Sequence, residues 1–188
     1  KFSTAIFTNL SRDHLDYHKS YKDYLNSKLI LFKNLLKKKS NIITDRDIPQ
    51  YNILQNIAKK KEKKIFTIGY NKSSIEILKH SYNDDKQHLK IRYKNKIYNL
   101  KINLIGKIQV KNILMSMIAA EKSNLNFNKI INSIDKIKNV NGRLEKVGNL
   151  KNNSIIILDY AHTPDALNNC LENIKDQFQN RKISIVFG

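Results

Sequence analysis

The chain of 188 residues carries a formal net charge of +19, and 40% of its residues are hydrophobic and 9% aromatic. This composition is typical of a folded protein of one or two domains and excludes a disordered chain. No apolar run reaches the roughly 18 residues that a membrane span needs, and no signal peptide is visible. The single cysteine, Cys170, excludes an internal disulfide and a cysteine-based zinc cluster, so we expect a small buried side chain and a cytoplasmic setting.

The positive charge lies in residues 1–150, because residues 151–188 carry equal numbers of basic and acidic side chains. Such a charge can indicate nucleic acid as a partner. However, aromatic residues are not interleaved with the basic runs as base stacking would require. Lys, Asn and Ile are also abundant together, which A/T-rich codons explain without a partner. We therefore expect no nucleic-acid partner, and a basic nucleic-acid-binding module is the alternative from a different class.

The hydrophobic pattern of the first 140 residues alternates between apolar strands and amphipathic helices, which predicts an α/β fold. Strands are expected at 4–8, 40–44 and 64–69, and alternating strands from 75 to 103 with a hairpin turn at Lys94-Asn95. Helices are expected over 20–38, 51–61, 108–125 (opened by Gly106) and about 129–138.

A domain boundary is expected near residues 139–141, so that 1–140 and 141–188 form different domains. In the second, residues 154–158 form an apolar strand typical of a buried parallel sheet. A helix follows over 163–178 and a further strand over 182–188, which together make the first βαβ unit of a Rossmann-like domain. Thr163 is the expected N-cap of that helix, with Pro164 at its first position. The expected buried stripe of the helix is Leu167, Leu171, Ile174 and Phe178.

Titratable side chains concentrate after the first strand, in "TNLSRDHLDYH". His14 follows a strand end, where α/β sheets bind ligands. His18 lies four residues further on, but the pair lacks the remaining features of a zinc-binding motif, and a helix-start role beside Ser20 is favoured. Lys28 falls on the apolar stripe of its helix. Its stem can pack while the amine reaches solvent, or burial can lower its pKa so that the amine adds carbon dioxide and becomes a carboxylate ligand for magnesium.

A second cluster lies in "DYAHTPDAL", residues 159–167. Asp159 and His162 stand between a strand end and a helix N-terminus, which favours anions. Helix capping accounts for Thr163 and Pro164 but for neither Asp159 nor His162. None of the five glycines fits a phosphate loop, so the main phosphate cradle of any nucleotide site is expected outside this chain. The absent initiator Met likewise indicates a fragment of a longer protein.

Taken together, "FTNLSRDHLDYH", "YLNSKLILF", "NGRLEKV" and "LDYAHTPDAL" closely resemble the Mur ligases. The motifs are most similar to the branch of the family that adds the third residue of the peptidoglycan stem peptide. The resemblance implies the later part of a central ATPase domain followed by the start of a C-terminal ligase domain. It also implies a cytoplasmic, monomeric enzyme that uses ATP and Mg²⁺ to join UDP-N-acetylmuramoyl-L-alanyl-D-glutamate to a diamino acid through an acyl phosphate.

By this resemblance, His14 is a magnesium ligand and Lys28 the carbamylated lysine that helps to hold the metal. Asn112 and Arg143 would face adenine and ribose, and Asp159 and His162 would meet ATP from the C-terminal domain. The sequence departs from the family at Gln109, which replaces the first Asn of G-x-x-N-x-x-N.

The fragment alone is expected to be inactive, and either diaminopimelate or lysine could be the added residue. The nearest alternatives are a ligase that adds D-Ala-D-Ala and a folylpolyglutamate synthase.

Overall fold

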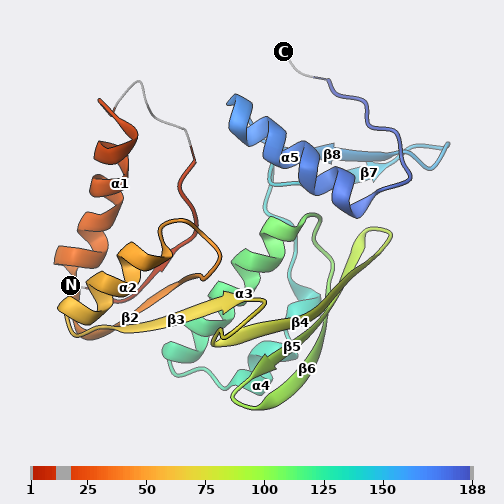
Figure 1. Ribbon diagram of the computed structural model, residues 1–188. Coiled ribbons are helices and arrows are strands. Elements are labelled where there is room, and N and C mark those ends of the chain that lie inside the picture. Colours follow the sequence, from red (N-terminus) through yellow and green to blue (C-terminus); the bar gives the residue numbers. More distant parts are fainter. Residues whose placement is uncertain (1, 12–17, 187–188) are drawn as a thin grey trace.

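The computed structural model describes residues 2–11 and 18–186 (Figure 1). Its main feature is a six-stranded sheet in sequence order. The first four strands pair in parallel and the last three in antiparallel fashion, so β4 has one neighbour of each kind. The strands are β1 (Phe2–Phe7), β2 (Leu36–Asp45), β3 (Lys64–Gly69), β4 (Ile75–Asn83), β5 (Lys86–Tyr93) and β6 (Lys96–Ile102). The predicted α/β class is confirmed.

Helices cover both faces of the parallel strands. They are α1 (Tyr21–Ile30), the π-helix η1 (Leu31–Leu35), α2 (Tyr51–Lys60), α3 (Lys107–Lys122), α4 (Phe127–Ile131) and the 3-10 helix η2 (Ile134–Lys136). Ile42 and Ile43 show how one strand serves two layers, because successive side chains point to opposite faces. Ile42 packs with α1, η1 and α2. Ile43 packs on the opposite face, with α3 and with apolar side chains of the other strands. Both side chains are completely buried.

Two predicted helices are shorter in the structure. The helix expected over 20–38 ends at residue 35, because residues 36–45 form β2, where Leu36 pairs with Phe2 and is buried. Sheet pairing here outweighs the helix propensity of the lysine run. The helix expected over 129–138 is divided into α4 and η2.

The turn at Lys94-Asn95 was predicted correctly. Both residues have positive φ, 47° and 63°, as a two-residue type I′ hairpin requires. The turn fixes the register of β5 and β6, so that Leu89 faces Leu100 and Ile91 faces Tyr98 over the core.

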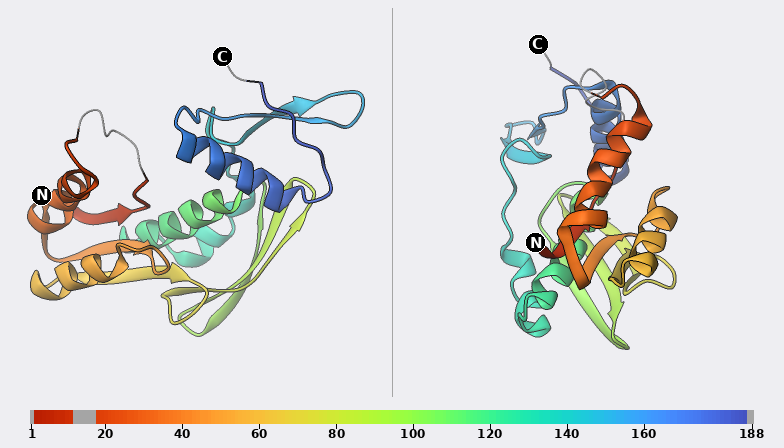
Figure 2. Two further views of the ribbon diagram at one scale, coloured as in Figure 1. Left: turned by 45° about the horizontal axis from the view of Figure 1, so that its top comes forward. Right: turned by 90° about the vertical axis from the view of Figure 1, so that its left-hand side faces the viewer.

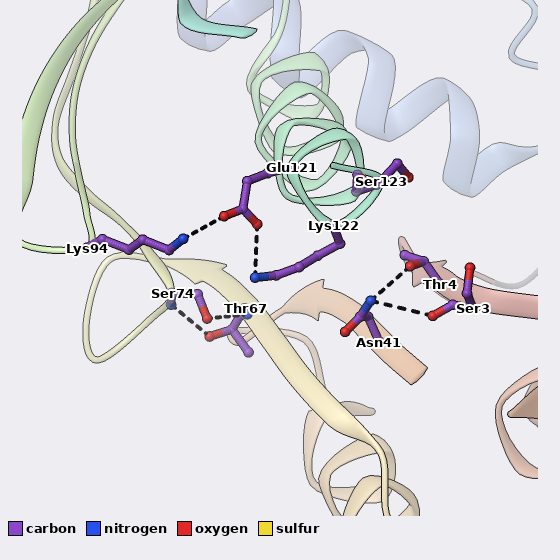
Figure 3. A network of polar contacts seen from close by, with 10 residues as sticks. Ser3, Thr4, Asn41, Thr67, Ser74, Lys94, Glu121, Lys122 and Ser123 are labelled. Atoms are coloured by element: carbon purple, nitrogen blue, oxygen red, sulfur yellow. Dashed lines mark hydrogen bonds and ion pairs between the residues drawn. The ribbon is translucent and has the colours of Figure 1, made fainter. Parts of the chain in front are cut away.

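Polar side chains tie the strand ends to each other and to α3 (Figure 3). Thr67 and Ser74 exchange two hydrogen bonds between backbone amides and hydroxyl oxygens, at 3.1 and 3.2 Å. Glu121 lies between Lys94 and Lys122, with N–O distances of 2.6 and 2.9 Å, and the Lys122 ammonium lies 4.0 Å from the Phe66 ring centroid. These contacts fasten the C-terminal end of α3 to the sheet.

The C-terminal unit consists of β7 (Glu145–Asn149), β8 (Ile155–Leu158) and α5 (Pro164–Gln177). β8 was predicted to lie in a parallel sheet, but it pairs with β7 in antiparallel fashion. Only one face of this two-stranded sheet is covered by α5, so Ile155 and Ile157 pack inward while Ile156 and Leu158 are exposed. The prediction of a fully buried strand was therefore wrong.

Two further expectations for this unit are corrected. Residues 182–186 form no strand, so the second strand of the expected βαβ unit is absent from this described segment. Cys170 and Ile174 on the packed face of α5, and Phe178 at its C-cap, belong to one apolar cluster with Ile105 of the main domain. Leu167 and Leu171 are half-buried and lie outside this cluster, because the small sheet and the start of α3 cover α5 from one side only.

Figures 1 and 2 place α5 across the N-terminal end of α3, beside the turn that joins β4 to β5. Within the described parts of the chain, no helix is long and apolar enough to cross a membrane.

Candidate functional site

A cavity of about 660 Å³ lies where the C-terminal unit meets the main sheet. Its walls come from the chain after β1, the first turns of α3, the segment before β7, the loop after β8 and the first half of α5. The carboxyl end of a parallel strand thus faces a helix N-terminus, the usual place for ligands in α/β proteins. The lining residues include Thr8, Asn9, Ile108, Gln109, Asn112, Val140, Arg143, Asp159, Tyr160, His162, Asn169 and Asn173.

Four of the six site residues predicted from the sequence line this cavity: Asn112, Arg143, Asp159 and His162. They come from three segments, namely α3, the chain before β7 and the loop after β8, which are up to 50 positions apart in the numbering, and the fold brings them together. Lys28 is not among the lining residues. His14 lies outside the described residues.

The N-terminus of α5 opens toward the cavity. Thr163 caps it, since its hydroxyl oxygen accepts the Ala166 N–H at 3.2 Å, and Pro164 is the first helical residue, as predicted. His162 is exposed and its Nδ1 lies 3.0 Å from the Tyr160 carbonyl oxygen. The first turn of α5 and His162 therefore lie in the same wall of the cavity.

Asp159 has a structural role that the sequence did not reveal. Its Oδ2 accepts the Leu144 N–H at 2.8 Å, and the next residue donates its N–H to the Gly142 carbonyl at 2.8 Å. Leu144 has a φ of 48°, an unfavourable value for a branched side chain. The carboxylate of Asp159 thus holds the segment before β7 in a strained conformation.

Asp159→Ala is accordingly expected to destabilise the protein by about 1–3 kcal/mol, because it leaves the part-buried Leu144 N–H without an acceptor. His162→Ala should change stability by no more than about 0.5 kcal/mol, since its side chain is exposed. Thr163→Ala should cost about 1 kcal/mol through the lost cap. Urea denaturation of the three variants measures these differences, and equal stability of Asp159→Ala and His162→Ala would contradict the role given to Asp159.

Gln109 bridges the two units at the base of the cavity. Its Nε2 donates to the Arg143 carbonyl at 3.1 Å, and the Arg143 guanidinium lies 5.9 Å from the Tyr160 ring centroid. The departure from the family pattern at this position therefore coincides with a contact between α3 and the segment before β7. In the sequence, the spacing from Gly106 to Asn112 was the only feature that drew attention to Gln109.

Cys170 also lines the cavity and packs with the C-terminal core. Burial, with a smaller contribution from the Asp159 charge, raises the pKa of its thiol to about 11. The thiol stays protonated at neutral pH, which argues against a nucleophilic role. The predicted packing role is the one that the structure supports.

Lys28 is half-buried on α1, next to the buried Tyr24 and Leu29. Its Nζ donates to the Asn9 carbonyl at 3.2 Å and lies 4.9 Å from the Tyr24 ring centroid. In this conformation the Lys28 amine lies beside the chain that follows β1, and Asn9 of that chain also lines the cavity.

His18 stacks on Tyr24, with ring centroids 4.9 Å apart, and precedes the α1 N-cap Ser20, whose hydroxyl accepts the Asp23 N–H at 3.1 Å. Among the residues that the structure describes, no group of three or more His, Cys, Asp or Glu side chains could hold a metal ion.

Comparison with known protein families finds matches over most of the chain. Residues 1–120 match the model of the Mur ligase middle domain, and residues 142–188 match that of the Mur ligase glutamate ligase domain. The chain belongs to the Mur ligase family. The cavity described above lies between these two matched segments.

Curated Mur ligases align with the whole chain. A protein of Rickettsia bellii (strain RML369-C) named UDP-N-acetylmuramoyl-L-alanyl-D-glutamate--2,6-diaminopimelate ligase is 35% identical over 189 residues, which cover 100% of this chain and 39% of that protein. A protein of the same name from Chelativorans sp. (strain BNC1) is 32% identical, with 100% and 39% covered. The chain thus spans about two fifths of the length of these relatives.

Solved Mur ligase structures share the fold. A structure titled as a UDP-N-acetylmuramoyl-L-alanyl-D-glutamate--2,6-diaminopimelate ligase superposes with a TM-score of 0.75 at 26% identity, over 92% of this chain and 35% of that one. The MurF ligase from Thermotoga maritima, solved in complex with ADP, gives a TM-score of 0.75 at 16% identity, over 91% of this chain and 38% of that one. At 16% identity, the similarity to the MurF structure shows a shared fold alone.

Proposed function

We propose that the cavity between α3 and the C-terminal unit binds the adenosine part of ATP. The observation that carries this proposal is the convergence of Asn112, Arg143 and His162 on one cavity from both matched segments. Ile108 and Val140 offer apolar surfaces for a flat ring, and the side-chain amides of Gln109 and Asn112 offer donors and acceptors for its edge. The permanent charge of Arg143 and the first turn of α5 suit the anionic part of a nucleotide.

We further propose that the protein carrying this chain is a ligase of peptidoglycan precursor synthesis. It would phosphorylate the terminal carboxylate of UDP-N-acetylmuramoyl-L-alanyl-D-glutamate, and the amine of diaminopimelate would then displace phosphate to form the peptide bond. The names of the relatives support diaminopimelate over lysine as the added residue. Action in the cytoplasm as a monomer is part of the same proposal.

Mg²⁺, when bound, would neutralise charge on the transferred phosphoryl group. His14 and a carbamate formed on Lys28 are its proposed ligands by resemblance. Lys28 is placed to reach the Asn9 carbonyl and thus lies near the chain after β1. As an ammonium it cannot ligate a cation, so its proposed role requires both loss of a proton and release from Asn9.

Nucleotide binding can be tested on the isotope-labelled chain itself. Titration with ADP and with adenosine should shift the backbone amide resonances of Gln109, Asn112 and Arg143. Asn112→Leu should raise the Kd for both ligands at least about tenfold, or about 1.4 kcal/mol. Asn52→Leu, on the exposed face of α2, is the matched control and should leave the Kd unchanged. Shifts confined to residues outside the cavity would contradict the proposed site.

The ligase activity is tested on the complete gene product. ADP release should require both UDP-N-acetylmuramoyl-L-alanyl-D-glutamate and a diamino acid, with diaminopimelate supporting a faster rate than lysine. ADP release that ignores the dipeptide substrate would refute the proposed reaction while leaving the nucleotide site intact.

A further inference from the structure

The junction between α5 and α3 contains a network of polar groups, of which the Gly106 N–H and the Gln177 amide are buried. Gly106 is the N-cap of α3 and has no side chain to cap the first turn of the helix. A helix leaves its first four N–H groups without partners inside the helix, and buried N–H groups need an acceptor. In this protein two of these N–H groups, those of Gly106 and Ile108, have their acceptors on α5.

Two side chains on α5 supply these acceptors. Asn173 Oδ1 accepts the Ile108 N–H at 3.1 Å, and Gln177 Oε1 accepts the Gly106 N–H at 2.9 Å. Gln177 is 6% exposed, and its Nε2 donates to the Asp84 carbonyl at 3.1 Å in the turn between β4 and β5. The cap of α3 therefore belongs to another part of the chain, about 65 residues away.

Gly106 is held from the other side as well. Its carbonyl accepts Nε2 of Gln87 at 3.1 Å, and the same nitrogen donates to the Leu104 carbonyl at 2.6 Å. Gln87 is completely buried, and its Oε1 lies 2.8 Å from His80 Nε2. Two glutamines, one from each unit, thus bind the two polar groups of one peptide residue.

Moving α5 away would leave the N–H groups of Gly106 and Ile108, and both ends of the Gln177 amide, without these partners. We propose that Asn173 and Gln177 are positioning residues that fix the C-terminal unit by capping α3 from outside the helix, and so set the width of the cavity. Asn173 and Ile108 both line the cavity, so the cap lies in its wall. This inference does not depend on which ligand the cavity holds.

Amide hydrogen exchange of the ligand-free chain tests the proposal. In Asn173→Leu, which keeps the volume but removes the acceptor, the Ile108 amide should exchange at least about tenfold faster. Asn173→Asp keeps the accepting oxygen and adds the negative charge that a helix N-terminus favours, so protection should be retained or increased. The Ile91 amide, in the middle of the sheet, should be unchanged in both variants and reports that the core is intact.

Asn168→Leu is the matched control, because Asn168 is exposed on the same helix and its amide donates to Glu172 of α5 rather than to α3. It should leave the Ile108 amide protected. Residual dipolar couplings provide the readout of orientation: one alignment tensor should fit both units in the parent chain, and two should be needed in Asn173→Leu/Gln177→Leu. Unchanged protection of Ile108 in Asn173→Leu, equal exchange in the Leu and Asp variants, or a single tensor in the double variant would overturn the proposal.

Discussion

Gly106→Ala is expected to lower the free energy of unfolding by about 2–5 kcal/mol. The backbone of Gly106 has a φ of 89°, where a side chain costs roughly 1–2 kcal/mol. An added Cβ would also lie 2.5 Å from Cδ1 of Leu144, with Asn173 at 3.1 Å. Leu144 is 3% exposed and cannot turn aside without disturbing the C-terminal core, and such overpacking costs about 1–3 kcal/mol.

Urea denaturation followed by circular dichroism measures this loss. Gly148→Ala is the matched control, since Gly148 lies outside the positive-φ region and nothing lies within 4 Å of an added Cβ. The control should stay within about 0.5 kcal/mol of the parent chain. If both variants lost the same stability, the close approach at Gly106 would not be the cause.

Lys111→Met is expected to cost about 3–5 kcal/mol of stability, because it leaves a buried charge without its partner. The charge is that of Asp45, which is 1% exposed at the end of β2, and its Oδ2 lies 2.5 Å from Lys111 Nζ on α3. The other oxygen, Oδ1, accepts the Asp47 N–H at 2.9 Å, so Lys111 is the partner that neutralises the carboxylate.

The exposed pair of Lys38 and Glu62, 3.0 Å apart, provides the comparison. Lys38→Met should cost no more than about 1 kcal/mol, because solvent screens that pair. Adding Asp45→Asn to Lys111→Met should restore part of the lost stability, since the amide oxygen can still accept from Asp47 without a net charge. Thermal or urea denaturation decides between the cases, and similar losses for Lys38→Met and Lys111→Met would contradict the buried ion pair.

The local sequence determined most of the secondary structure and the ends of several elements. The turn at Lys94-Asn95 and the cap at Thr163 each depend on residues that are neighbours in the chain, and the structure confirms them. The Mur ligase resemblance could likewise be read from the motifs, because it rests on residue identities and their order.

The contacts between segments that are distant in the sequence were decided by the tertiary structure. Leu36 became part of a strand because Phe2 pairs with it, and β8 became half-exposed because its partner is β7 rather than a covered parallel neighbour. Local propensity does not encode either partner. The same holds for Lys28, whose contact with Asn9 depends on how α1 packs beside β1.

The site shows the same division. The sequence identified Asn112, Arg143, Asp159 and His162 one by one, and folding brought them to a single cavity. It did not reveal that Asp159 supports Leu144, or that Asn173 and Gln177 cap a helix about 65 residues away. A hydrogen bond needs two groups within about 3 Å in a set orientation, and for residues so far apart in the chain only the packing of α5 on α3 creates that geometry.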